Sequence, residues 1–175
     1  MKGEVQSMKR FPSPRAKFQA YLLPAPWEAR AFYRCIADLL KHPKVRQMAQ
    51  YVQHGDTTCL EHCLHVAYLT YRFCRRHGLA YRAATRAALL HDFFLYDWHT
   101  HHQLTGERFH GFHHPATALQ NALMEFVLTP MQQDIIRKHM WPLTLVPPRY
   151  KEAYVVMWMD KYAALLETLD RLSNR

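Results

Sequence analysis

Apolar positions recur with helical spacing along most of the chain, and short polar or proline-containing segments separate them. We predict helices over residues 26–41, 43–51, 58–78, 81–92, 115–127, 129–140 and 148–171. Thr58 with Glu61 forms a capping box, in which the two side chains satisfy free amides at a helix start. Thr129 and Gln132 offer the same signal. No strand of note is expected, so the pattern predicts an all-α fold.

The composition fits one helical domain preceded by an arm. A chain of 175 residues is expected to form one domain with a substantial core, and only 5 glycines argue against an all-β fold. Residues 1–25 are basic and interrupted by prolines, so we interpret them as an N-terminal arm and residues 26–175 as the helical domain. The net charge of +9 favours contact with polyanions, either phosphorylated substrates or nucleic acid.

The four cysteines are predicted to be buried structural thiols. Cys59 and Cys63 lie one turn apart and flank His62, but no C-x-x-C pair supports a zinc cluster. The basic N-terminus lacks the apolar core of a secretory signal, and no apolar stretch approaches the roughly 20 residues of a membrane span. We therefore expect a cytoplasmic protein with reduced cysteines.

Two acidic residues stand in strongly apolar surroundings. Asp92 follows His91 at the end of the alanine-rich run 83–90, and Asp160 follows six apolar residues in the last predicted helix. A buried carboxylate is costly unless a partner neutralises it, and a metal cation is the simplest partner. The chain also has 13 histidines, most of them between His54 and His139. Together these features predict a metal site.

The order of the histidines indicates which side chains bind the metal. His62 falls in the first turn of its predicted helix, and His65 lies three residues later on a similar face. Two imidazoles and two carboxylates can hold a divalent ion and leave positions for water: His62, His91, Asp92 and Asp160. His114 and His139 are well placed for a second ion. Such ligands suit Fe, Mn, Ni, Co or Zn, so we expect one or two of these ions.

In order and local context, these residues resemble the signature of the HD-domain metal-dependent phosphohydrolases: a histidine, a His-Asp pair and a final aspartate. The resemblance rests on the segments EHCLHVA (61–67), LLHD (89–92) and MDKY (159–162), and it covers residues 55–170. It implies a single-domain HD-type helical bundle with the metal site between helices. It also implies one ion with four ligands: His62, His91, Asp92 and Asp160.

The additional histidines resemble the six-ligand variant of this family, which includes two-metal enzymes such as bacterial hydrolases of diadenosine tetraphosphate. This variant implies a second ion held by His114 and His139, with Asp92 bridging the two ions. His110 or His113 are alternatives to His114. We favour His114 because it directly precedes Pro115, the expected start of a helix.

A phosphorylated substrate also needs cations beside the metals. Lys161 directly follows a proposed ligand and is our first candidate phosphate contact; with Asp92 it is a candidate catalytic residue. Arg149 and Arg137 are further candidates for substrate binding. Four aromatic residues are candidates either for stacking on a base or for the core: Trp98, Phe112, Trp141 and Tyr150. The loops 93–113 and 142–148 are expected to shape the pocket.

These inferences predict a metal-dependent phosphohydrolase that acts on a nucleotide or related phosphoester through a metal-activated water. The expected partner is a phosphorylated small molecule, with no membrane and no nucleic acid. Two alternatives remain open. One is a non-catalytic metal-binding or regulatory module. The other is a basic nucleic-acid-binding protein, although no recognised nucleic-acid motif accompanies the charge.

Overall fold

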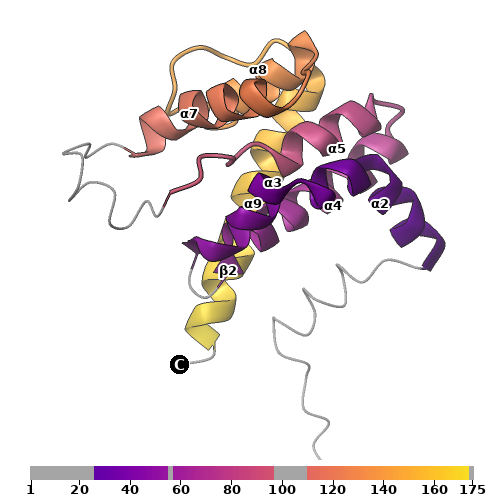
Figure 1. Cartoon of the computed structure of the whole chain (residues 1–175), viewed down its shortest axis with the longest axis horizontal. Helices are drawn as coiled ribbons and strands as arrows, with labels where there is room; N and C mark the ends of the chain where they lie inside the picture. Colours follow the sequence, from indigo (N-terminus) through magenta and orange to yellow (C-terminus); the bar gives the residue numbers. More distant parts are fainter. Residues whose placement is uncertain (1–25, 55–56, 97–109, 174–175) are drawn as a thin grey trace, which may run out of the picture.

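The computed structural model describes residues 26–54, 57–96 and 110–173, which form a bundle of helices (Figure 1). Its elements in chain order are α2 (Pro26–Lys41), α3 (Pro43–Gln47), the 3-10 helix η1 (Met48–Gln50), β1 (Val52–His54), β2 (Thr57–Thr58), α4 (Cys59–Arg76), α5 (Tyr81–Leu89), α7 (His110–Glu125), α8 (Pro130–Lys138) and α9 (Lys151–Ser173). The prediction of an all-α fold is confirmed, because the two short strands form a single small ribbon within the described ranges. The predicted arm, residues 1–25, lies outside the described residues.

Helix α4 organises the core. It packs against both α5 and α9, and most of its inward-facing side chains are fully buried. Ile36 of α2, Leu89 of α5 and Val156 of α9 are also fully buried in the same apolar cluster. A helix packed on several sides holds its side chains in fixed directions, because protein interiors are close-packed. Polar residues on α4 therefore sit at well-defined points inside the bundle.

Helices α7 and α8 lie together at one end of the bundle, while α9 runs along the molecule to the C-terminus (Figure 1). Helix α8 also contacts α5 and α9. The end of α8 and the middle of α9 are thereby brought towards the end of α5. Segments far apart in sequence meet at this point.

Both predicted capping boxes are confirmed. The Thr58 hydroxyl accepts from the backbone N–H of Glu61, and the Glu61 carboxylate accepts from the Thr58 backbone N–H at 2.9 Å. Thr129 and Gln132 make the same reciprocal pair at the start of α8. These pairs fix where α4 and α8 begin, and each helix leads to a histidine of the predicted site.

The structure corrects the end of the helix predicted over residues 81–92. Our prediction extended it to Asp92, whereas α5 ends at Leu89. The ring Nδ1 of His91 lies 2.7 Å from the carbonyl oxygen of Ala88, which would accept the backbone N–H of Asp92 if the helix continued. The His-Asp pair therefore lies in a turn, where its side chains can point in directions that a helix would not allow.

The structure also corrects the segment before Pro115. Helix α7 begins at His110, and Pro115 lies inside it with a buried ring. Pro115 is the sixth residue of α7 and therefore lies beyond the first turn, so it removes one internal hydrogen bond, the one from its own position to the carbonyl of residue 111. The predicted loop 93–113 is thus helical from residue 110, and residues 97–109 lie outside the described part of the chain. No strand of note was expected between the predicted helices 43–51 and 58–78, but β1 (Val52–His54) pairs there with β2 (Thr57–Thr58).

All four cysteines are buried and none forms a disulfide, as the prediction of structural thiols requires. Burial raises the pKa of the Cys74 thiol to about 12. Within the described ranges, no helix has the length and apolar character that crossing a membrane requires.

Candidate metal centre

The structure brings together the side chains of all six residues proposed as metal ligands. They are His62 from α4, His91 and Asp92 from the turn after α5, His114 from α7, His139 directly after α8, and Asp160 from α9. Each of the six is at most 8% exposed. Asp160 Oδ1 lies 3.0 Å from His62 Nε2 and 3.5 Å from His91 Nε2. Four imidazoles and two carboxylates thus form one buried cluster.

Asp92 lies between two parts of this cluster. Its Oδ2 is 3.4 Å from His91 Nε2, whereas its Oδ1 is 3.2 Å from His114 Nε2 and 3.4 Å from His139 Nε2. The Nε2 atoms of His114 and His139 are 2.8 Å apart. The two oxygens of one carboxylate therefore face different imidazoles, which is the arrangement that a carboxylate bridging two ions requires.

Two hydrogen bonds to the backbone carbonyl of Asp92 fix the His-Asp turn. The Cys59 thiol at the start of α4 donates to the carbonyl oxygen of Asp92 at 3.3 Å. The backbone N–H of Phe94 donates to the same oxygen at 2.8 Å. These bonds hold the Asp92 backbone against the start of α4 and so limit where its side chain can point.

Hydrogen bonds to carbonyl groups define how two of the imidazoles are protonated. His91 Nδ1 lies 2.7 Å from Ala88 O, and His139 Nδ1 lies 2.9 Å from Ile136 O. A carbonyl oxygen can only accept, so each Nδ1 carries a hydrogen, and in the neutral ring each Nε2 presents a lone pair. Both Nε2 atoms point into the cluster. This is the state in which histidine binds a metal.

The donor atoms fit a divalent ion. Metal–nitrogen bonds of about 2.1 Å place neighbouring ligand atoms on a tetrahedral or octahedral ion about 3.0 to 3.4 Å apart. The shortest separations within the cluster, from 2.8 to 3.5 Å, cover this range. Among the described residues, His91 Nε2 and Asp92 Oδ1 are buried and make no hydrogen bond. A cation is the partner that satisfies both atoms, because each offers a lone pair.

The pKa shifts of the two carboxylates are consistent with binding of a divalent cation. Burial opposes the charged form of Asp92, but the nearby imidazoles of His91 and His114 hold its pKa well below the usual range. Burial likewise opposes the charged form of Asp160, while the hydrogen bond from His62 and the nearby imidazole of His91 lower its pKa. Burial lowers the pKa of His139. At neutral pH, both acids are therefore ionised and His139 is neutral.

His62 and His91 hold protons more firmly than free histidine. Burial disfavours the charged ring of His62, yet hydrogen bonds to Asp160 and Glu167 raise its pKa well above 6.5. Burial also disfavours the charged ring of His91, but the charge of Asp92 raises its pKa. A metal ion that binds these rings must therefore displace protons.

The sequence analysis did not identify two residues that contact the proposed ligands. Gln53 of β1 donates from Nε2 to Asp92 Oδ2 at 2.6 Å, and Glu167 of α9 accepts from His62 Nδ1 at 2.9 Å. Glu167 lies seven residues after Asp160, two turns further along the same helix face, so its spacing was a usable signal. Gln53 lies in a short polar segment and offers no such signal.

Helix phase separates the three neighbouring histidines of α7. His114 shares the buried face of the helix with Ala118 and Ala122, at intervals of four residues, whereas His113 is exposed. The side chain of His110 lies outside the described residues. The repeat of four therefore directs His114 into the cluster.

The predicted substrate contacts differ in how exposed they are. Lys161 is half-buried, and its Nζ donates to the carbonyl oxygen of His139 at 3.4 Å. Burial lowers the pKa of Lys161. The side chains of Arg137 and Arg149 lie on the exposed surface. Among the aromatic candidates, Phe112 is exposed, Trp141 and Tyr150 are half-buried, and Trp98 lies outside the described residues.

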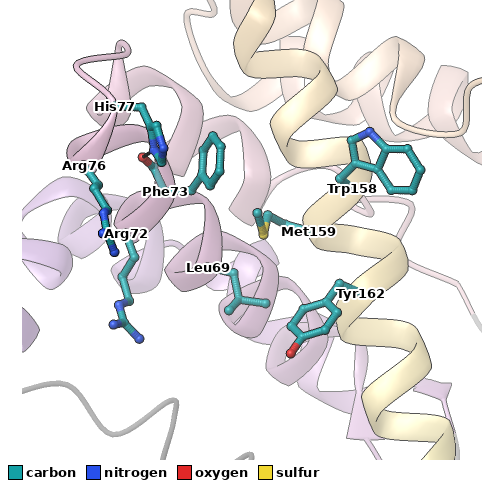
Figure 2. A pocket seen from close by; sticks show the side chains of 8 residues that line it. All are labelled: Leu69, Arg72, Phe73, Arg76, His77, Trp158, Met159 and Tyr162. Carbon is teal, nitrogen blue, oxygen red and sulfur yellow. Dashed lines mark hydrogen bonds between the residues drawn. The ribbon is translucent and has the colours of Figure 1, made fainter.

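A concave feature lies between α4 and α9. This groove has a volume of about 630 Å³ and is lined by Leu69, Arg72, Phe73, Arg76, His77, Trp158, Met159 and Tyr162. Figure 2 shows side chains of α4 on one wall and those of α9 on the other. None of the six proposed ligands lines it, so the groove is separate from the metal cluster.

A buried cluster of histidines and aspartates that could hold a metal ion lies between the helices of an all-α fold. The family model of the HD domain matches residues 59–165, so the chain belongs to the HD domain family. HD domains are generally metal-dependent phosphohydrolases. Comparison with curated proteins gave no match, and comparison with solved structures gave none.

Proposed function

We propose that this protein is a metal-dependent phosphohydrolase that acts on a nucleotide or a related small phosphoester. The position of Asp92 carries this proposal, because its two oxygens face separate groups of histidine ligands inside one buried cluster. A carboxylate in that position can hold two ions at the separation of about 4 Å that two-metal hydrolases use.

The ligands divide into two sets. The first ion would be held by His62, His91, Asp92 and Asp160, and the second by His114 and His139 with Asp92 shared. Divalent ions there would polarise a phosphoryl oxygen and make a water molecule acidic at neutral pH. The mixture of imidazole and carboxylate donors suits Mn, Fe, Co, Ni or Zn.

The residues around the ligands support binding of an anionic substrate. The Lys161 ammonium lies beside the backbone of His139, so it can contact a phosphoryl oxygen of a substrate that reaches the second set of ligands. Arg137 and Arg149 are exposed, and they add positive charge that attracts phosphate from solution. We propose that Lys161 orients the phosphoryl group and that the two arginines act mainly on association.

A non-catalytic metal centre is the second candidate. The observation that favours it is the burial of the ligands, none of which is more than 8% exposed. In structural metal sites, protein ligands fill every coordination position, whereas catalytic sites keep one position open for water or substrate. Ligands that are this buried favour the first kind of site. Turnover distinguishes the two functions.

The test combines metal content with an activity screen. Protein without a histidine tag is loaded with Mn²⁺, Fe²⁺, Co²⁺ or Zn²⁺ and assayed on phosphomonoesters, phosphodiesters, cyclic nucleotides and dinucleoside polyphosphates. We expect metal-dependent hydrolysis of at least one class, lost in Asp92→Asn and strongly reduced in Lys161→Met. Bound metal without turnover of any class would favour the non-catalytic centre.

A further inference from the structure

Glu167 is a buried carboxylate outside the proposed ligand set. It is 6% exposed and lies on α9, seven residues after Asp160. Its Oε2 accepts from His62 Nδ1 at 2.9 Å, and its Oε1 accepts from His65 Nδ1 at 2.8 Å. Both oxygens are therefore used, and both partners are imidazoles of α4.

This contact fixes the ring of His62 from the side opposite the cluster. A carboxylate can only accept, so Nδ1 of His62 carries a hydrogen, and its Nε2 faces Asp160 Oδ1 at 3.0 Å. In His91 and His139 the same support comes from backbone carbonyl oxygens. Of these three ligands, His62 is the one supported by a charged side chain.

We propose that Glu167 is a positioning residue that sets the orientation and tautomer of His62 for metal binding, and that His65 in turn holds Glu167. This inference rests on the proposed metal centre. A carboxylate behind a metal-bound histidine makes the ring a stronger donor and prevents it from rotating. His65, half-buried on the same helix as His62, occupies the second oxygen and so keeps the carboxylate from turning away.

Helix α9 provides a matched control. Glu152 also joins α9 to another part of the bundle, because its Oε1 accepts from the backbone N–H of Ala80 at 3.0 Å. It contacts no histidine in the described part of the chain. Replacement of Glu152 removes a carboxylate that links elements but leaves the support of His62 intact.

The experiment measures affinity for Mn²⁺ by isothermal titration of the full chain at one fixed pH. The variants are Glu167→Ala, Glu167→Gln, His65→Gln and Glu152→Gln. We expect Glu167→Ala to weaken the tighter Mn²⁺ site about 10- to 100-fold, the usual cost of removing a partner behind a metal ligand. Glu167→Gln, which retains an acceptor oxygen but not the charge, should give an intermediate loss. Glu152→Gln should leave the affinity unchanged.

Nitrogen-15 spectra of the histidine rings give a second readout, with diamagnetic Zn²⁺ in place of Mn²⁺. Wild-type His62 should show a protonated Nδ1 and a metal-bound Nε2, and Glu167→Ala should lose this single state. If the alanine variant does not fold, the glutamine variant decides the question. Wild-type Mn²⁺ affinity in both Glu167 variants would overturn the inference, and so would an equal loss of affinity in Glu152→Gln. Phosphoester turnover by the wild-type chain would still support the proposed function in either case. A wild-type chain that binds no metal would overturn both.

Discussion

Replacement of Asp92 by asparagine should disable both halves of the metal centre. Asparagine keeps the size of the side chain but removes its charge and replaces one oxygen with an NH₂ donor. Gln53 donates to the Oδ2 position at 2.6 Å, so the amide oxygen of the variant should remain there. The NH₂ group then takes the Oδ1 position, 3.2 Å from His114 Nε2. We expect the second ion to be lost and the first to bind more weakly.

The size of the effect follows from the number of ions lost. An ion present at roughly 100 times its dissociation constant adds about 2.7 kcal/mol to the free energy of unfolding. In a chain of this length, 1 kcal/mol corresponds to roughly 2–4 °C in Tm. Each ion should therefore raise Tm by roughly 5–10 °C. The metal-dependent rise in Tm of the wild-type protein should be about twice that of His114→Ala. The rise for Asp92→Asn should be smaller than both.

Thermal unfolding with and without metal, together with elemental analysis, tests this expectation. Asp134→Asn is the matched control, because Asp134 accepts from the backbone N–H of Arg149 and contacts no proposed ligand in the described residues. It should retain the wild-type metal content and the wild-type metal-dependent shift in Tm. Two bound ions and a full shift in Asp92→Asn would refute the bridging role.

Four further predictions concern other parts of the molecule. In metal-free protein, the raised pKa of His62 stabilises the fold fully below about pH 6.5, and this contribution is lost as pH rises through the raised pKa. Metal affinity should instead increase with pH, because binding displaces the proton of His62. Denaturation and metal titration between about pH 5.5 and 8.5 measure these opposite trends. Lys161→Met should lower kcat/KM at unchanged metal content, and a fall in metal content would contradict its role towards substrate. Ile136→Ala in the core should cost about 2–5 kcal/mol in urea denaturation. Thr129→Ala should cost about 1 kcal/mol through loss of the α8 cap, and a value near zero would show that the capping box is not stabilising.

The parts of the fold that depend on local chemistry were predictable from the sequence. The two capping boxes and the helices over α2, α4 and α8 follow from spacing and turn residues, because neighbouring positions determine them. The metal hypothesis followed from isolated acids in apolar runs. Asp92 and Asp160 drew attention because burial of an unpaired charge is costly, and both are buried.

The remaining features depend on contacts between distant segments. Helix α5 stops at Leu89 because the His91 ring binds a backbone carbonyl, and no pattern in the alanine-rich run reveals this competition. Gln53 lies in a short polar segment with no helical pattern, and its contact with Asp92 arises from packing. The spacing of Glu167 from Asp160 places both on one face of α9, but its contact with His62 depends on how α9 packs against α4. We favoured His114 because it precedes Pro115, whereas the burial of His114 follows from the phase of α7, which begins five residues before that proline.

The distribution of the ligands along the chain affects when an ion can be captured. The closest contact of His62 in the cluster is with Asp160, 98 residues later in the sequence, and α9 also supplies Glu167. A partly synthesised chain that lacks α9 has neither of these carboxylates. The complete first set of proposed ligands therefore exists only after α9 docks, so binding of the first ion would be a late step in maturation. A bound ion would then act as a non-covalent cross-link between α4 and α9, and it would protect the backbone amides of both helices from hydrogen exchange.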